Sequence, residues 1–210
     1  MKTRTITYEE KIYSFNELSD TAKEKAKEKY LESFHEPFIF TESCTERIKE
    51  IFPNSELNVE YSLSYSQGDG FNIYGKMAIK DAVNFVIDNR GNIFDNKEKR
   101  FLQFLANNGY TLRLTENRAR YSYCYIEYND FVNDINDDLE QDDYVKGLRK
   151  QQNTLIKFSN ALKTLIAGMC KDFENEGYTF FYEVEEEEII DCWEANDYEG
   201  FDENGNPIYQ

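Results

Sequence analysis

Apolar positions recur along the chain at both helical and strand-like spacings. Residues 5–13 are rich in Thr, Ile and Tyr and predict a strand. A helix is predicted to begin after Ser19, because Ala22, Ala26 and Tyr30 follow at steps of four among Lys and Glu residues. A second helix is predicted over residues 41–52, where Pro53 would end it. The first third of the chain is therefore predicted to hold both helices and strands.

The middle of the chain predicts hairpins. Residues 57–65 alternate between apolar and polar side chains, and the Gly-Asp-Gly at positions 68–70 precedes further strand from Phe71. This turn has two interpretations: a recognition loop, or ordinary turn chemistry in which glycine supplies a positive φ and Asp69 caps the turn. A helix is predicted within residues 92–107, with Gly109 as its stop, and a second strand pair around residues 115–117.

One long helix is predicted near residues 142–175. Its apolar stripe follows steps of three and four and comprises Val145, Leu148, Gln152, Leu155, Ser159, Leu162, Ile166, Met169 and Phe173. The stripe has two alternatives: packing on a sheet, or a seam that joins two copies of the chain. The polar Gln152 and Ser159 weaken the seam and favour packing on a sheet.

The C-terminal part predicts a strand at residues 177–184, a short helix at residues 187–196 and a hairpin around residues 203–205. Together the elements predict an α+β fold in which an antiparallel sheet of hairpins packs against several helices. We expect a single domain over residues 1–210, because no flexible linker is visible. The alternative is a mixed α/β part at 1–130 and a long helix with an acidic C-terminal part at 131–210.

Charge is the main chemical feature of the sequence. The 210 residues include 24 Lys and Arg against 41 Asp and Glu, a formal net charge of −17. This balance argues against a protein that binds nucleic acid directly through a basic face. No Lys or Arg follows Lys171. Two acidic stretches supply the candidate partner-binding residues, which are Asp137, Asp138, Glu140, Asp142, Asp143, Glu185, Glu186, Glu187, Glu188, Asp191 and Glu194.

These carboxylates have three interpretations. They can keep the protein soluble, or imitate a phosphate backbone and bind a basic surface on a partner, or hold a cation for hydrolysis. A cation site would use Asp130, Asp134 and Asp138 at steps of four, or the partial calcium-loop pattern at Asp202 and Asn204. The ring of ligands that an EF-hand needs is missing from that pattern, so we expect no metal site and no cofactor.

Scarce residue types argue against an enzyme. Cys44, Cys124, Cys170 and Cys192 form no CxxC pair, and we expect free thiols, with Cys170 in the core. His35 is the one histidine and is expected at the end of a helix, so no catalytic residues are predicted. The N-terminus has no apolar signal core and no run approaches the roughly 20 residues of a membrane helix. We therefore expect a cytoplasmic protein without a membrane segment.

A tyrosine cluster offers one further candidate surface. Tyr121, Tyr123 and Tyr125 share one face of a predicted strand and resemble a stacking platform for bases. Arg113, Arg118 and Arg120 lie nearby in the sequence. A role in the core or at a protein interface is favoured over contact with nucleic acid.

Three motifs occur in an order that resembles a family of phage and prophage proteins. They are FNELSDTAKEKAKEKY at residues 15–30, YSLSYSQGDGFNIYG at 61–75 and EANDYEGFDENGNPI at 194–208. In the last of these Gly200 is an extra residue that we expect to bulge the final strand. The resemblance brings no catalytic residues. It implies a mobile-element origin and the cytoplasm of a host bacterial cell.

By this resemblance, the chain is expected to be a non-enzymatic inhibitor of a host defence enzyme that targets nucleic acid, in the manner of anti-CRISPR proteins. A CRISPR effector is the leading example of its partner, bound through acidic residues that mimic DNA. The alternative is a phage structural, assembly or regulatory interaction protein that forms a homodimer through its long helix.

Overall fold

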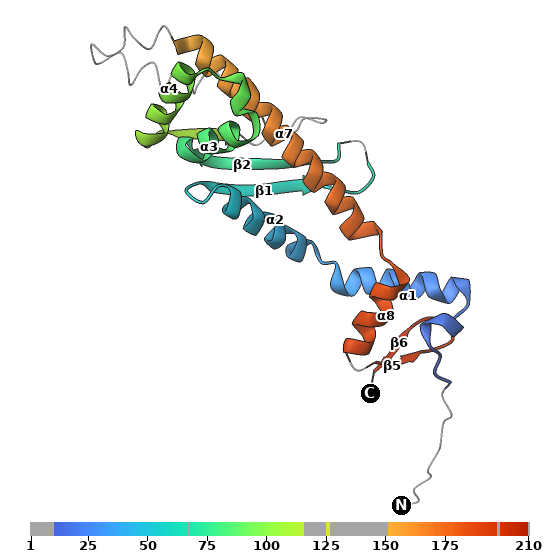
Figure 1. Ribbon diagram of the computed structural model, residues 1–210. Coiled ribbons are helices and arrows are strands. Elements are labelled where there is room, and N and C mark those ends of the chain that lie inside the picture. The colour runs from blue at the N-terminus through green and yellow to red at the C-terminus, as the bar shows by residue number, and fades with distance from the viewer. Residues whose placement is uncertain (1–10, 67, 116–124, 127–150, 197, 210) are drawn as a thin grey trace, which may run out of the picture. The chain divides into compact units, whose positions relative to one another are not determined.

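The computed structural model describes residues 11–66, 68–115, 125–126, 151–196 and 198–209 (Figure 1). The helices and antiparallel sheets confirm the predicted α+β class, including one long helix. The chain divides into two compact units, each with its own buried core. The terminal unit comprises residues 1–40 and 178–210, and the central unit comprises residues 41–177.

The terminal unit joins the two ends of the chain. Its elements are η1 (Phe15–Glu17), α1 (Asp20–Phe34), α8 (Glu186–Ala195), β5 (Tyr198–Phe201) and β6 (Pro207–Tyr209). Helix α1 begins as predicted, since Ser19 is its N-cap and accepts a 3.3 Å hydrogen bond from the amide of Ala22. Helix α8 and the final hairpin also form where the sequence predicts them.

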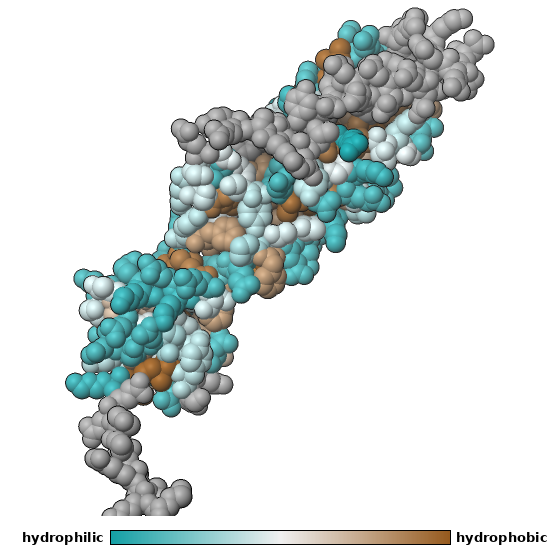
Figure 2. Space-filling view, turned by 180° about the vertical axis from the view of Figure 1, so that it is seen from behind, coloured by the Kyte–Doolittle hydropathy of each residue, from teal (hydrophilic) through white to brown (hydrophobic). Residues whose placement is uncertain are grey.

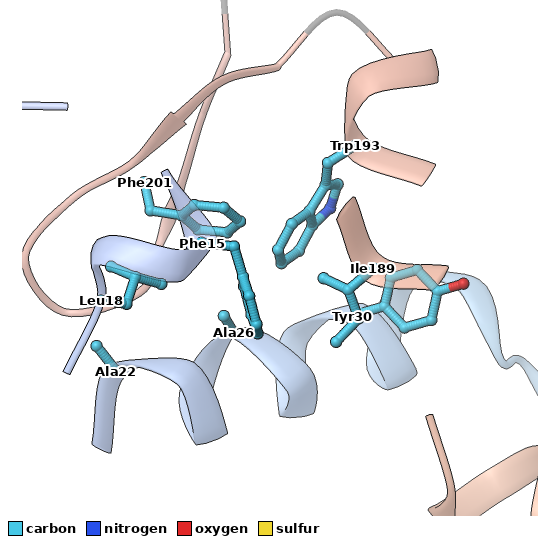
Figure 3. Packing of buried hydrophobic residues seen from close by; sticks show 8 residues of the cluster. All are labelled: Phe15, Leu18, Ala22, Ala26, Tyr30, Ile189, Trp193 and Phe201. Carbon is cyan, nitrogen blue, oxygen red and sulfur yellow. The ribbon is translucent and has the colours of Figure 1, made fainter. Parts of the chain in front are cut away.

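Small and large side chains interlock in the core of this unit. Ala22 and Ala26 are buried on α1 and leave room above the helix for rings from other elements (Figure 3). The Trp193 ring packs edge-on against Phe201, with ring centroids 4.3 Å apart. Large side chains thus close over the small face of α1, where each aromatic ring contributes much apolar area.

The β5–β6 hairpin carries the predicted irregularity. The register shifts between Tyr198 and Gly200, and Gly200 has a φ of +146°, a conformation that favours glycine. The predicted strand at residues 5–13 reaches the described part of the chain only at its end. There Tyr13 forms an antiparallel bridge to Phe201, with two backbone hydrogen bonds of 2.9 Å.

The central unit contains a four-stranded antiparallel sheet in the order β1-β2-β3-β4. The strands are β1 (Glu56–Ser62), β2 (Gly70–Ala78), β3 (Thr111–Thr115) and β4 (Tyr125–Ile126). Its helices are α2 (Pro37–Ile51, which begins in the terminal unit), α3 (Ile79–Arg90), η2 (Gly91–Ile93) and α4 (Asn96–Asn107). The β1–β2 hairpin confirms the first predicted strand pair, and the antiparallel pairing of β3 with β4 confirms the second where its residues are described.

The long helix α7 (Gln152–Tyr182) packs on this sheet. Phe71 of β2 stacks on Phe173 of α7, with ring centroids 5.0 Å apart. Within the predicted stripe, the side chains of Leu155, Ser159, Leu162, Ile166 and Phe173 are buried. The stripe therefore packs within the central unit. Of the two predicted alternatives, this is packing on a sheet and not a seam between two copies of the chain. Val145 and Leu148 lie outside the described residues.

One local prediction was wrong, and one helix was not predicted. Residues 178–182 continue α7 instead of forming a strand. Their β-favouring aromatic side chains are accommodated because extending an existing helix costs little, and because Phe180 and Phe181 both pack against Phe40. No element was predicted over residues 79–90, which form helix α3, whereas the further strand expected from Phe71 is confirmed as β2. Ala82, Val83 and Val86 form the buried face of α3.

Candidate functional site

The exposed carboxylates of α8 are the described part of the predicted binding surface. The helix is fixed by Ile189 and Trp193, one turn apart, which are buried against α1 (Figure 3). Glu186, Glu187 and Glu188 occupy its first turn, where negative charge is favourable near the N-terminus of a helix. The same sequence feature therefore stabilises the helix and makes its surface acidic.

The most outward face of α8 carries Glu187, Asp191 and Glu194. At 100° per residue these positions point away from Ile189 and Trp193, and all three side chains are exposed. Among the residues that the structure describes, none of the three forms an ion pair within 4 Å. We call these three residues the α8 acidic face. Its carboxylates are exposed to solvent and available to an external cation or a basic surface.

Glu186 differs from its neighbours because it faces α1. Its carboxylate lies 3.7 Å from the ammonium of Lys23 and 3.6 Å from that of Lys27. Such exposed pairs contribute about 0–1 kcal/mol each. Glu186 therefore helps to dock α8 on α1, and its charge is partly neutralised within the unit. The sequence grouped it with the other glutamates because the run of four gives no sign of which one faces a lysine.

Glu188 acts on the buried edge of the helix. Burial, followed by the negative charge of Glu188 and then by Cys192, raises the pKa of Tyr30 to about 12. The pKa of the Cys192 thiol is also raised, first by burial. The phenol and the thiol are thus uncharged at neutral pH, so they add no negative charge to the contact of α8 with α1 beyond that of Glu186, which lies beside Lys23 and Lys27.

The other half of the predicted binding set lies outside the described residues. Asp137, Asp138, Glu140, Asp142 and Asp143 belong to residues 127–150. The second acidic stretch, Glu185, Glu186, Glu187, Glu188, Asp191 and Glu194, lies on α8 or at its N-cap, and every one of these side chains is exposed. The described candidate site is therefore one acidic helix.

A metal site finds no geometric support in the part of the chain that the structure describes, where no three His, Cys, Asp or Glu residues come together as ligands. Asp130, Asp134 and Asp138 lie outside that part. The Asp202 carboxylate accepts hydrogen bonds of 2.9 Å from the amide of Asn204, and of 2.8 and 2.6 Å from the amide and side chain of Asn206. These hydrogen bonds, chiefly those from Asn206, lower the pKa of Asp202. This carboxylate closes the final turn.

His35 ends α1, as the sequence predicts. It is the C-cap residue of α1, and its ring stacks on Phe180 with centroids 4.5 Å apart. Nδ1 donates a hydrogen bond to the carbonyl of Phe180 near the end of α7. The cysteines also follow the prediction where they are described: Cys44, Cys170 and Cys192 are free thiols, and Cys170 is in the core. These residues serve packing and helix ends.

The tyrosine platform lies almost wholly outside the described residues, which include only the backbone pairing of Tyr125 with Thr115. Arg113 is exposed on β3, while Arg118 and Arg120 also lie outside them. The face of the terminal unit seen in Figure 2 is mostly hydrophilic. None of the described helices combines the length and apolar character that crossing a membrane requires.

Comparison with known proteins adds no assignment. The chain matches no protein-family model, no curated protein and no solved structure. The geometry of the α8 acidic face is therefore the structural basis for a functional proposal.

Proposed function

We propose that this protein is a non-enzymatic inhibitor that binds a basic surface on a host nucleic-acid-targeting defence enzyme in the bacterial cytoplasm. The single observation that carries the proposal is the α8 acidic face, with three exposed carboxylates that no described cation neutralises. The phage-like motifs give the class of target, of which a CRISPR effector is the leading example.

Charge complementarity would hold such a complex together. A channel that holds nucleic acid is lined with Lys and Arg, and it attracts carboxylates held in fixed positions by the same forces that attract phosphates. Helix α8 holds Glu187, Asp191 and Glu194 at defined spacing on a docked helix. The net charge of −17 adds long-range attraction to a basic partner. Such binding is fast at low salt and weakens as salt rises.

The assembly alternative has less support. Its predicted dimer seam uses Leu155, Leu162 and Ile166, which are buried within the central unit. Burial of these side chains leaves them unavailable to a second copy unless the unit opens. We therefore do not propose dimerisation through α7.

The proposal is tested with the full-length chain immobilised and exposed to host lysate at low and at high salt. The bound proteins are identified by mass spectrometry. We expect a basic nucleic-acid enzyme that is retained at low salt and released at high salt. The purified partner is then tested for inhibition of its nucleic-acid cleavage by the added chain.

A matched pair of variants separates the α8 acidic face from overall charge. The triple variant E187Q/D191N/E194Q removes three exposed charges from α8, and E42Q/E46Q/E50Q removes three exposed charges from α2. We expect the first to weaken association by about ten-fold or more and the second to change it far less. Equal effects of the two variants, or a partner that is indifferent to salt, contradict the proposal.

A further inference from the structure

The loop between β1 and β2 displays one aromatic side chain in a conformation that folding alone does not favour. Tyr65 has a φ of +53°, and it is the one non-glycine residue with a positive φ in the described part of the chain. Residues with a Cβ are disfavoured in this left-handed region. The Tyr65 side chain is nevertheless 66% exposed. An exposed ring carried at an unfavourable backbone position is a candidate contact for a partner.

The loop is organised around the carboxylate of Asp69. Oδ2 accepts hydrogen bonds from the backbone amides of Ser64, at 2.7 Å, and of Ser66, at 2.9 Å. Oδ1 accepts from the hydroxyls of Ser62, Ser64 and Ser66 at 3.0–3.2 Å. The two amides flank Tyr65 on either side, so Asp69 fixes the backbone that carries the ring. The turn chemistry predicted for Asp69 is thereby confirmed.

The base of this loop is anchored to the central unit. Tyr61 stacks on Phe71 across the hairpin, with centroids 5.8 Å apart and an interplanar angle of 4°. The Tyr61 hydroxyl lies 3.0 Å from the hydroxyl of Thr41 on α2, and Leu63 is buried. Tyr65 therefore extends from a loop that is fixed both at its base and around its own backbone. Such preorganisation reduces the entropy lost on binding.

The composition of the loop fits a protein partner. Of the nine residues 62–70, six are Ser, Gly or Tyr, the residue types that dominate antibody binding loops. Asp69 is the one charged residue among residues 61–75, although 31% of the whole chain is charged. Its charge is satisfied by the serine hydroxyls and the backbone amides. The centres of protein interfaces are likewise poor in charge and rich in Tyr.

We propose that Tyr65 is an anchor residue whose ring enters an apolar pocket on a protein partner. Asp69 is its positioning residue. The ring supplies contact area that does not depend on salt, whereas the α8 acidic face supplies an attraction that does. A nucleic-acid ligand is disfavoured because the loop carries a carboxylate and, between residues 61 and 75, no Lys or Arg.

The test depends on the proposed function only because that function supplies the probe. The probe is the purified protein that the wild-type chain retains from host lysate treated with nuclease. Dissociation of this partner from the immobilised full-length chain is measured at low and high salt. We expect Y65S to dissociate at least about ten-fold faster at both salt concentrations. Tyr209 is also 66% exposed, and we expect Y209S to dissociate at the wild-type rate.

The same variants separate binding from folding. Asn tolerates a positive φ better than Tyr, so we expect Y65N to melt at or above the wild-type temperature while losing the partner as Y65S does. We expect Y65F to keep most of the binding, because the ring supplies the contact area. A wild-type dissociation rate for Y65S, or lower melting temperatures for both Y65S and Y65N, overturns the inference.

The outcomes also separate this inference from the proposed function. If the triple α8 variant loses the partner and Y65S keeps it, the anchor role fails and the proposed function stands. If Y65S loses the partner and the α8 variant keeps it, the proposed function fails and the anchor role stands. If the wild-type chain retains no protein from the treated lysate, or only nucleic acid from the untreated lysate, both proposals are overturned.

Discussion

Gly205 of the final turn lies directly against the backbone carbonyl of Ala22 in α1. A Cβ at position 205 would overlap this carbonyl oxygen, and Gly205 also has a φ of +80°. Next to it, the Asn206 side chain accepts a 2.5 Å hydrogen bond from the ammonium of Lys29. The last turn of the chain is therefore docked on the first long helix through a contact that only glycine permits.

This contact predicts the effect of Gly205→Ala. Alanine would meet both backbone strain and overlap with Ala22, and the overlap involves backbone that cannot move without shifting α1. We expect a loss of about 2–4 kcal/mol in the stability of the terminal unit. The measurement is chemical unfolding followed by fluorescence of Trp193, the one tryptophan.

Gly109 provides the matched control for this substitution. Its φ is +73°, but a Cβ there would meet nothing within 4 Å. Gly109→Ala therefore introduces the backbone strain without the steric overlap. We expect it to lower the free energy of unfolding by about 1–2 kcal/mol, measured by unfolding monitored with circular dichroism. A Gly205→Ala variant no less stable than Gly109→Ala would show that the hairpin is not docked as described.

The buried carboxylate of Asp81 is expected to stabilise the central unit. This carboxylate is buried and accepts hydrogen bonds from the amide of Asn54 at 2.8 Å, its side chain at 2.7 Å, and the hydroxyl of Ser55 at 2.7 Å. Asp81→Ala leaves these donors without their acceptor, which we expect to cost about 2–3 kcal/mol. Thermal unfolding by circular dichroism gives the value.

The control for Asp81 lies on the same helix. Asp88 is exposed, and we expect Asp88→Ala to change stability by no more than about 0.5 kcal/mol. Comparable losses from the two substitutions would mean that helix propensity or charge, and not the buried hydrogen bonds, sets the cost.

Glu98 predicts a loss of stability in acid. The hydrogen bond from the ammonium of Lys157, followed by that from the amide of Asp95, lowers the pKa of Glu98 from its ordinary value of 4.5. A group with a lowered folded pKa stabilises the fold above its unfolded pKa, and this contribution is lost as pH falls through the folded value. The central unit should therefore lose stability progressively below about pH 4.5.

Glu98→Gln tests this assignment. The amide cannot ionise, so we expect a variant less stable by about 0.5–1 kcal/mol at neutral pH, with a flatter dependence on pH in acid. Melting temperatures over a series of acidic buffers give both quantities. Parallel curves for the wild type and the variant would assign the acid dependence to other carboxylates.

Two tyrosines predict the behaviour of the terminal unit in alkali. The pKa of Tyr30 is raised to about 12, mainly by burial and next by the negative charge of Glu188. The pKa of Tyr198 is also raised to about 12, mainly by burial and next by its hydrogen bond with Tyr209. A raised folded pKa gives stability that is present below the ordinary value of 10.0 and is lost as pH rises toward 12. Trp193 fluorescence should report unfolding in this range.

Tyr30→Phe is the test of the alkaline transition. Phenylalanine cannot ionise, so we expect the variant to unfold at higher pH than the wild type and to lose one late-titrating phenol in ultraviolet absorbance. An unchanged transition would place the alkali-sensitive group elsewhere.

Local sequence signals predicted many of the elements. Helix α1 was predicted from the N-cap Ser19 and the apolar stripe of Ala22, Ala26 and Tyr30. The β1–β2 hairpin was predicted from the alternation of apolar and polar residues before Asp69. The extra Gly200 gave the bulge in β5. In each case the signal is a spacing or a backbone preference that acts within a few residues, which a single sequence displays.

The same signals could not divide the acidic residues by role. Glu186 and Glu187 are neighbours in one run of glutamates, yet Glu186 lies beside Lys23 and Lys27 while Glu187 belongs to the α8 acidic face. This distinction depends on which side of α8 packs on α1, about 160 residues away along the chain.

The sequence by itself determined the α+β class, the ends of α1 and α8, the β1–β2 hairpin and the acidic character of α8, because these follow from local periodicity, capping and charge. Only the tertiary structure decided that residues 178–182 are helical, that the α7 stripe is buried within the central unit, and that Tyr65 is displayed at a positive φ. Each of these depends on contacts between distant segments, whose packing energy outweighs local preference.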